Sequence, residues 1–126
     1  MNADILLVDD NAIQAATRKA ILTRSGRSVV VAQDGGQALA MLCDTVSPRL
    51  VITDHLMPGM NGPEFVKRLR TNCPDSDLPV VVLSGMADAE EQYAHLDVVF
   101  RVKPLPPDHL LELVRSLLNE PIARSA

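Results

Sequence analysis

Five polar side chains of types that do chemistry each lie at or just past the end of a short apolar run in this sequence. They are Asp9 and Asp10 after residues 5–8, Asp54 after residues 50–52, Ser84 after residues 80–83, and Lys103 after residues 98–100. In folds that alternate strands and helices, chemistry collects at the carboxyl ends of the strands. We therefore expect three carboxylates, a hydroxyl and an ammonium group on one rim of the molecule.

Such a group of side chains points to phosphate chemistry. Three clustered carboxylates raise each other's pKa unless a cation lies among them. Their oxygen ligands suit Mg²⁺, which keeps several waters and also binds phosphate. Lys103 and Ser84 would add a positive charge and a hydroxyl donor, so that with the metal they could hold three phosphoryl oxygens. One carboxylate would then be left as the nucleophile, and carboxylates do form acyl phosphates.

The elements that would position these groups follow from the apolar pattern. The five runs are continuous rather than alternating, which favours strands that are covered on both faces, as in a parallel sheet. They lie at residues 5–8, 29–31, 50–52, 80–83 and 98–100. Segments with helical spacing separate them, and this repeated alternation predicts an α/β fold, a (βα)5 doubly wound parallel sheet with right-handed crossovers.

Helix ends and faces can be assigned in part. Gly26 should close the first helix, Asp34 should cap the second, Asn61 with Glu64 should begin the third, and the last should follow Pro106-Pro107. The segment 85–97 has room for only about two helical turns, and residues 120–126 read as a frayed tail. The expected apolar faces are Ile13, Ala16, Ala20 and Ile21; Ala38, Leu39 and Leu42; Phe65, Val66 and Leu69; and Leu110, Leu111, Val114, Leu117 and Leu118.

Composition narrows the class of protein. The 126 residues suit one domain spanning 1–126, the formal net charge is −4, and aromatic residues make up only 2%. An acidic chain without a basic cluster or stacking aromatics argues against direct nucleic-acid binding. No apolar run is long enough to cross a membrane, and the first ten residues lack a signal peptide's basic start. Cys43 and Cys73 fit reduced thiols, so we expect a cytoplasmic protein.

At the residues that follow the strands, the sequence resembles the receiver domain of two-component response regulators, the CheY-like family. The matching segments are Val8-Asp9-Asp10-Asn11, the stretch from Asp54 to Gly62, Leu83-Ser84-Gly85, and Phe100-Arg101-Val102-Lys103-Pro104. The resemblance runs from about residue 4 to residue 119. It implies a flavodoxin-like sheet with strand order 2-1-3-4-5.

The resemblance also implies roles at the acidic site. Asp54 matches the phosphoacceptor, which takes a phosphoryl group from a phosphohistidine of a sensor histidine kinase or a histidine phosphotransfer protein. Asp10 and Asp54 would bind Mg²⁺ directly with the backbone carbonyl of Leu56, and Asp9 would act nearby or through water. Lys103 matches the residue that pairs with Asp54 and then with the phosphoryl group. Beyond accepting and slowly losing this group, the chain is not expected to be an enzyme.

Further roles concern switching and docking. Ser84 and Phe100 match the family's switch pair, in which the hydroxyl moves to a phosphoryl oxygen and the ring turns into the vacated space. Pro104 is expected after a cis peptide bond. The kinase should dock partly on the outer face of the first helix, where we place Gln14, Thr17 and Arg18. Since a receiver fills residues 4–119 and leaves no room for an output domain, the signal should leave through a surface, in a monomer or weak dimer, to a downstream protein.

Two departures from the family pattern matter. Lys103 follows Ser84 by only 19 positions, and the usual Gly-Ala before the fifth strand is missing, so the fourth helix should be short, shifted or mobile. Leu56 and Met86 are apolar where many receivers carry polar side chains that orient water. We therefore expect slow hydrolysis of the Asp54 acyl phosphate.

Other interpretations stay open at this point. A phosphatase of the haloacid dehalogenase type also uses an aspartyl phosphate, but it needs Asp-x-Asp after the first strand, where this chain has Asp9-Asp10-Asn11. A pseudo-receiver would serve only for interaction. Gly35-Gly36 lacks the pattern of a phosphate loop. The three histidines, His55, His95 and His109, read as isolated, with His55 placed to affect access to the site; Met57, Met60 and Met86 read as loop packing.

Overall fold

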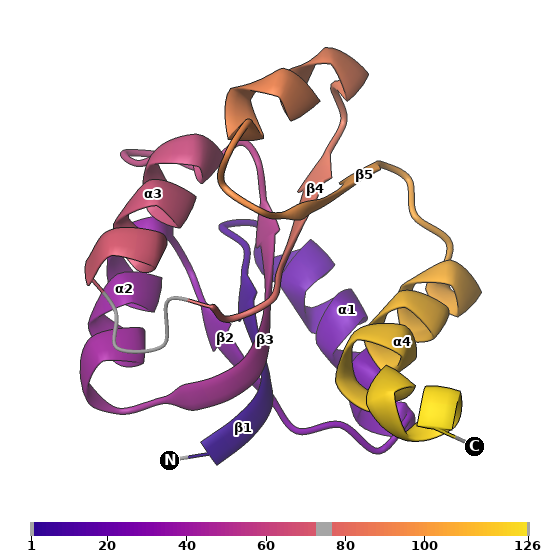
Figure 1. Ribbon diagram of the computed structural model, residues 1–126. Coiled ribbons are helices and arrows are strands. Elements are labelled where there is room, and N and C mark those ends of the chain that lie inside the picture. Colours follow the sequence, from indigo (N-terminus) through magenta and orange to yellow (C-terminus); the bar gives the residue numbers. More distant parts are fainter. Residues whose placement is uncertain (1, 73–76, 126) are drawn as a thin grey trace.

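The computed structural model describes residues 2–72 and 77–125, with side chains described as far as Leu118. Strands and helices alternate along the chain (Figure 1). In order they are β1 (Asn2–Val8), α1 (Ala12–Arg24), β2 (Val29–Ala32), α2 (Gly35–Asp44), β3 (Ser47–Asp54), α3 (Gly62–Asn72), β4 (Val80–Ser84), the 3₁₀ helix η1 (Ala87–Tyr93), β5 (Val99–Val102) and α4 (Pro107–Ser125).

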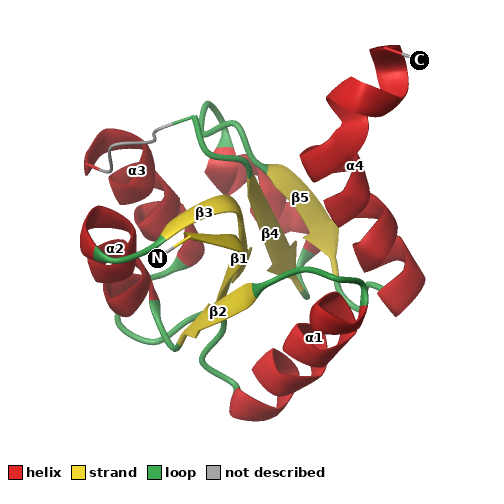
Figure 2. Cartoon of the chain, turned by 90° about the horizontal axis from the view of Figure 1, so that it is seen from below, coloured by secondary structure: helices red, strands yellow, loops and turns green. Residues whose placement is uncertain are grey.

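The five strands form one parallel sheet in the order β2-β1-β3-β4-β5, which confirms the predicted doubly wound fold. Helices α2 and α3 lie on one side of the sheet, and α1 and α4 lie on the other (Figures 1 and 2). In the register of the sheet Asp54 of β3 pairs with Leu83 of β4, and Ser84 pairs with Val102 of β5. The carboxyl ends of β3, β4 and β5 therefore meet at one edge, as expected.

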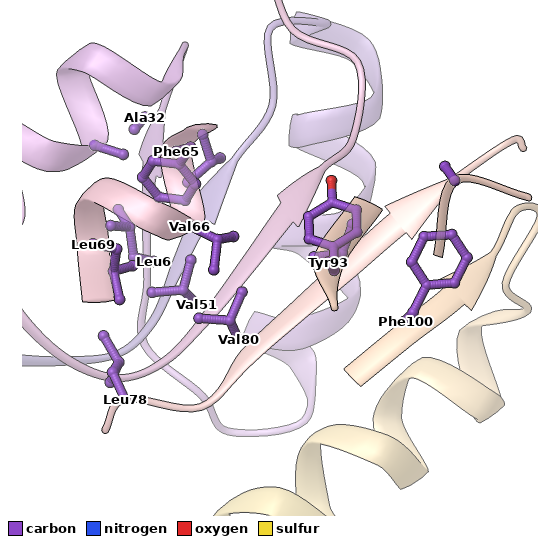
Figure 3. Packing of buried hydrophobic residues seen from close by; sticks show 14 residues of the cluster. Leu6, Ala32, Val51, Phe65, Val66, Leu69, Leu78, Val80, Tyr93 and Phe100 are labelled. Carbon is purple, nitrogen blue, oxygen red and sulfur yellow. The ribbon is translucent and has the colours of Figure 1, made fainter. Parts of the chain in front are cut away.

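Both faces of the sheet are buried, which explains the continuous apolar runs. Successive side chains of a strand point to opposite faces. Leu6, Val51, Val80 and Val82 accordingly pack with α2, α3 and η1, whereas Ile5, Leu50, Ile52 and Val81 pack with α1 and α4. Figure 3 shows part of the first cluster, in which Phe65, Val66 and Leu69 of α3 lie over Leu6, Val51 and Val80. The predicted inward faces of the second, third and last helices are confirmed.

The predicted face of the first helix is wrong. Ile13 is 79% exposed, Ala16 and Ala20 are exposed, and the helix instead buries Ala15 and Leu22. The buried positions are seven residues apart on one face of the helix, and Arg18 lies between them on that face. Small alanines at many positions of α1 made several faces look equally apolar in the sequence. At about 3.6 residues per turn, the buried face lies on nearly the opposite side of the helix from the predicted one, and this difference moves Arg18 from the outer face to the inner one.

Local signals for the helix ends hold well. The Asn11 side chain accepts hydrogen bonds from the backbone N–H groups of Ile13 and Gln14, and Asp34 and Asn61 do the same for Gln37 and Glu64. At the end of α1, Gly26 has a φ of 94°, where glycine is favoured. Its N–H donates to the carbonyl of Thr23 and that of Arg27 donates to Leu22, the paired bonds of a Schellman motif.

The segment after β4 is short, as the spacing predicted. It forms η1, a seven-residue 3₁₀ helix that buries Ala89 and Tyr93 and leaves Asp88, Glu90 and Glu91 exposed. Cys43 is exposed on α2, and Cys73 lies outside the described residues. The tail predicted at 120–126 is wrong as far as Ser125, because α4 continues to that residue, and Ala126 lies outside the described residues. Within the described part of the chain, no helix is long and apolar enough to cross a membrane.

Candidate functional site

The three predicted carboxylates come together at the edge of the sheet. Oxygen atoms of Asp9, Asp10 and Asp54 lie within 4.8 Å of one another. Asp9 follows β1 and Asp54 ends β3, the neighbouring strand, so the sheet itself brings them side by side. Asp9 and Asp54 are almost completely buried, whereas Asp10 is exposed. The group therefore combines two fixed carboxylates with one that faces solvent.

Lys103 contacts the acceptor candidate directly. Its Nζ lies 2.9 Å from Oδ1 of Asp54 and 3.4 Å from Oε1 of Gln14. The backbone N–H of Lys103 donates to the carbonyl of Ser84 at 2.7 Å, which fixes the start of the chain after β5 against β4. The Lys103–Pro104 peptide bond is cis. The side chain of Lys103 is 29% exposed, so the ion pair is reached by solvent.

A second cation, which the helical pattern placed elsewhere, also lies in the site. Nη1 of Arg18 is 2.8 Å from Oδ2 of Asp9 and 3.2 Å from Oδ1 of Asp54. Its side chain is only 16% exposed, so the prediction that Arg18 lies on the outer face of α1 is wrong. Because Ala15 and Leu22 face the sheet, Arg18 must also point inward, toward the strand ends. In the sequence, the seven-residue spacing of Ala15 and Leu22 was the signal that could have placed Arg18, between them, on the same face of the helix.

Burial and the repulsion by a neighbouring carboxylate raise the pKa of Asp9. Desolvation and the neighbouring Asp54 raise the pKa of Asp9 to about 6, although the Asn11 N–H and Arg18 favour its charged form. The Asn11 backbone N–H donates to Oδ1 of Asp9 at 2.9 Å, and Arg18 donates to Oδ2. Both oxygens of this carboxylate thus have partners within the protein.

Ser84 is buried at the end of β4, and its hydroxyl is held by its own turn. The hydroxyl oxygen accepts from the Met86 N–H at 2.9 Å and the hydroxyl donates to the Met86 carbonyl at 3.1 Å.

The apolar residues Leu56 and Met86, close in sequence to Asp54 and Ser84, are 66% and 42% exposed. Met57 and Met60 pack against the core as expected, but Met86 does not.

On the opposite face of the sheet, His55 forms a contact that sequence reasoning missed. His55 is buried, and its Nδ1 lies 2.6 Å from the Tyr93 hydroxyl oxygen. It is therefore neither isolated nor placed to affect access to the acidic group. The Tyr93 ring lies 5.9 Å from that of Phe100, which is also buried (Figure 3). Burial lowers the pKa of His55 and raises that of Tyr93, so both are neutral at pH 7.

Comparisons with known proteins agree with this geometry. A family model described as the response regulator receiver domain matches residues 5–115. The response regulator MprA of Mycobacterium sp. (strain KMS) is 34% identical over 122 residues, which make up 94% of this chain and 52% of that protein. The chain thus spans about half the length of the curated relatives it matches.

The fold is also similar to that of solved structures. The chemotaxis protein CheY4 of Vibrio cholerae superposes with a TM-score of 0.83 at 28% identity, covering 94% of this chain and 100% of that chain. The receiver domain of a histidine kinase from Syntrophus aciditrophicus gives a TM-score of 0.83 at 29% identity, covering 94% of this chain and 91% of that chain.

Proposed function

The chain belongs to the response regulator receiver family, and we propose that it is a phosphoacceptor of a two-component phosphorelay in which Asp54 takes the phosphoryl group. One observation carries this proposal. The Asp54 carboxylate is buried at a strand end, contacts Lys103 at 2.9 Å, and lies within 4.8 Å of two further carboxylates. A nucleophilic carboxylate, a cation for the phosphoryl oxygens and ligands for a metal are thereby gathered at one place.

The donor set at this site fits a hard divalent cation. The clustered side-chain ligands are all carboxylate oxygens, and the exposed Asp10 leaves room for the waters that Mg²⁺ retains. In our proposal Asp10 and Asp54 would hold Mg²⁺ with the Leu56 carbonyl, and Asp9 would act nearby or through water. When bound, the ion would offset the negative charge of the phosphoryl oxygens.

The transfer itself needs little from the protein beyond positioning. An Asp54 oxygen forms the new bond to phosphorus, while the bond from phosphorus to the donor histidine nitrogen breaks and its electron pair stays on the imidazole. Lys103 then donates to a phosphoryl oxygen instead of to Asp54. The Ser84 hydroxyl leaves its Met86 partners and donates to another phosphoryl oxygen, and the Phe100 ring turns into the space that the hydroxyl vacates, as the family resemblance implies.

We propose a sensor histidine kinase or a histidine phosphotransfer protein as the donor, and a downstream protein as the receiver of the signal. Thr17 is exposed on α1, and Gln14 is half-buried beside Lys103, so both remain candidates for donor contact. A cytoplasmic location and a monomer or weak dimer belong to the same proposal.

The test is incubation with Mg²⁺ and acetyl phosphate or phosphoramidate, followed by mass spectrometry of the intact protein. We expect a gain of one phosphoryl group that is lost in Asp54→Asn. The exposed Asp44, at the end of α2, supplies the matched control, since Asp44→Asn should still gain the group. No gain in the wild-type protein would favour a pseudo-receiver, and turnover of a phosphoester would favour a phosphatase.

A further inference from the structure

In the acidic site, a side chain of the protein already places a positive charge between the two carboxylates that β1 and β3 bring together. Arg18 bridges Oδ2 of Asp9 and Oδ1 of Asp54 at 2.8 and 3.2 Å. Lys103 contacts the same oxygen of Asp54 at 2.9 Å. Two positive side chains therefore face three carboxylates, and the group carries one net negative charge when all three are ionised.

The hydrogen bonds of Asp9 make this bridge consequential for metal binding. One of its oxygens accepts from the Asn11 N–H and the other from Arg18. The first bond belongs to the turn that begins α1, and it is fixed by the backbone. Arg18, by contrast, is held only by its side chain. Of the two partners of Asp9, Arg18 is therefore the one that can leave when a metal approaches.

A position for the displaced side chain lies next to the site. A groove of about 260 Å³ is lined by Arg18 itself, by Thr17 and Ile21 of α1, and by Leu105 and Leu110. Its walls are largely apolar, which suits the methylene stem of an arginine whose charged group reaches water. Arg18 thus has one polar arrangement on the carboxylates and space for a second beside them.

We infer that Arg18 is a tethered cation that competes with Mg²⁺ for Asp9 and Asp54, so that this residue sets the apparent affinity of the site for the metal. The inference rests on the proposed function, because it takes the carboxylates as the metal site. A divalent cation placed among Arg18, Lys103 and the carboxylates would leave the group with a net positive charge. Release of Arg18 restores neutrality, with three negative charges against Lys103 and the metal.

The size of the effect follows from the population of the bridged arrangement. Apparent affinity falls by the fraction of molecules that can bind. If Arg18 bridges the carboxylates in about nine molecules of ten, removing it should tighten metal binding by about tenfold. The same substitution at a distant arginine should change the affinity little, because interactions between exposed charges are largely screened beyond about 10 Å at 0.1 M salt.

The experiment measures metal binding alone, without phosphorylation. Mg²⁺ binding by calorimetry and Mn²⁺ binding by electron paramagnetic resonance are compared at pH 7.5 in the wild-type protein, Arg18→Met and Arg24→Met. Arg24 is exposed in the last turn of the same helix and supplies the control for lost charge. We expect about tenfold tighter binding in Arg18→Met and no change in Arg24→Met. Equal affinities in all three proteins would overturn the inference and leave the proposed function intact.

A second measurement uses the wild-type protein and does not depend on how the variant folds. The guanidinium ¹⁵N signals of Arg18 should shift during a Mg²⁺ titration with the same midpoint as the carboxyl ¹³C signal of Asp54. A shift at Asp54 without one at Arg18 would overturn the inference. Asp10→Asn tests the proposed metal site separately from the role of Arg18. If the wild-type protein does not bind the metal, or if Asp10→Asn still binds it, the proposed metal site is wrong as well.

Discussion

Asp54 and His55 are neighbours in the chain, yet they lead into two very different environments. On the α1 side of the sheet, Asp54 belongs to a charged group with Asp9, Arg18 and Lys103. On the α3 side, His55 bonds to Tyr93, whose ring packs near Phe100. The alternation of side chains along β3 continues one residue past its end and produces this division, because successive residues point to opposite faces.

The two environments should respond to different changes. Solvent reaches the ion pair of Lys103 with Asp54, so that pair contributes little to stability. Arg18 instead offsets the charge of the buried Asp9, and its role depends on whether another cation takes its place. A buried neutral hydrogen bond among aromatic rings contributes to stability and leaves no charge for a metal or phosphate to bind. We therefore expect the charged side to determine ligand binding and pH dependence, and the neutral side to determine how firmly η1 is held against the sheet.

The largest effect should come from removing Tyr93. Tyr93→Ala deletes a buried aromatic side chain and should lower the free energy of unfolding by about 3–5 kcal/mol. Tyr93→Phe keeps the ring but leaves the His55 nitrogen buried without its partner, so it should cost about 1–2 kcal/mol. Urea unfolding measures both. A loss below about 1 kcal/mol for Tyr93→Ala would show that the neutral side is not what holds η1.

The next effect tests how closely Tyr93 approaches α3. A Cβ added at Gly62 would collide with the Tyr93 hydroxyl and would lie 3.2 Å from the backbone of His55. Gly62→Ala should therefore cost about 3 kcal/mol, at the upper end of overpacking effects. Gly85 is the matched control, since a Cβ there meets nothing within 4 Å.

The double variant sharpens this result. In a Tyr93→Phe background the hydroxyl is gone, so Gly62→Ala should cost clearly less than in the wild-type protein, by about 1 kcal/mol or more. Strict additivity in urea unfolding would show that the two residues do not meet in solution.

On the charged side, the free energy of unfolding should depend on pH through Asp9. Its pKa is about 6 in the folded protein against 3.8 for an unperturbed group, so the folded state binds a proton more readily than the unfolded state. This carboxylate therefore destabilises the fold above pH 6, and the penalty is relieved as pH falls from 6 toward 4. Relative to Asp9→Asn, the wild-type protein should gain about 2 kcal/mol between pH 7.5 and 4.5.

The measurement is urea unfolding of both proteins across this pH range with a chelator present, since a bound metal would hold Asp9 ionised. A difference between the two proteins that stays constant with pH would mean that Arg18 fully compensates the burial of Asp9. A difference that moves in the opposite direction would mean that the pKa of Asp9 is lowered rather than raised.

The same division explains what could be predicted from the sequence. The strands and their order follow from continuous apolar runs and the family resemblance, and the three carboxylates follow from the positions at which those runs end. The runs and their ends are local signals, and a parallel sheet carries them to one edge without further information. The sequence alone was therefore enough to place Asp9, Asp54 and Lys103 together.

Arg18 and the pair of His55 and Tyr93 depend on features that the sequence carries only weakly. The direction of Arg18 depends on the phase of α1, and a helix rich in alanine presents several faces of similar hydrophobicity. The contact between His55 and Tyr93 joins residues 38 positions apart. It depends on how the short η1 lies over β4 and β5, which is a matter of tertiary packing.

The smallest effect concerns Leu56, which follows His55 and belongs to neither environment. Its side chain is 66% exposed two residues after Asp54, and an apolar group cannot orient a water for attack on the proposed acyl phosphate. Leu56→Asn supplies a donor and an acceptor, and it should shorten the lifetime of phosphorylated Asp54 by about tenfold, a small share of what a positioned polar group can contribute. Because the residue is exposed, stability should change by less than about 0.5 kcal/mol.

Loss of radiolabel from the phosphorylated protein in Mg²⁺ measures this lifetime, with Leu56→Met as the control that keeps the side chain apolar. A lifetime of seconds in the wild-type protein would contradict slow hydrolysis. Equal lifetimes in the wild-type protein and Leu56→Asn would mean instead that access of water is limited by the charged groups around Asp54. Adding Arg18→Met would then test this explanation. If the charged groups limit the access of water, the added substitution should change the lifetime by the same factor in the wild-type protein and in Leu56→Asn.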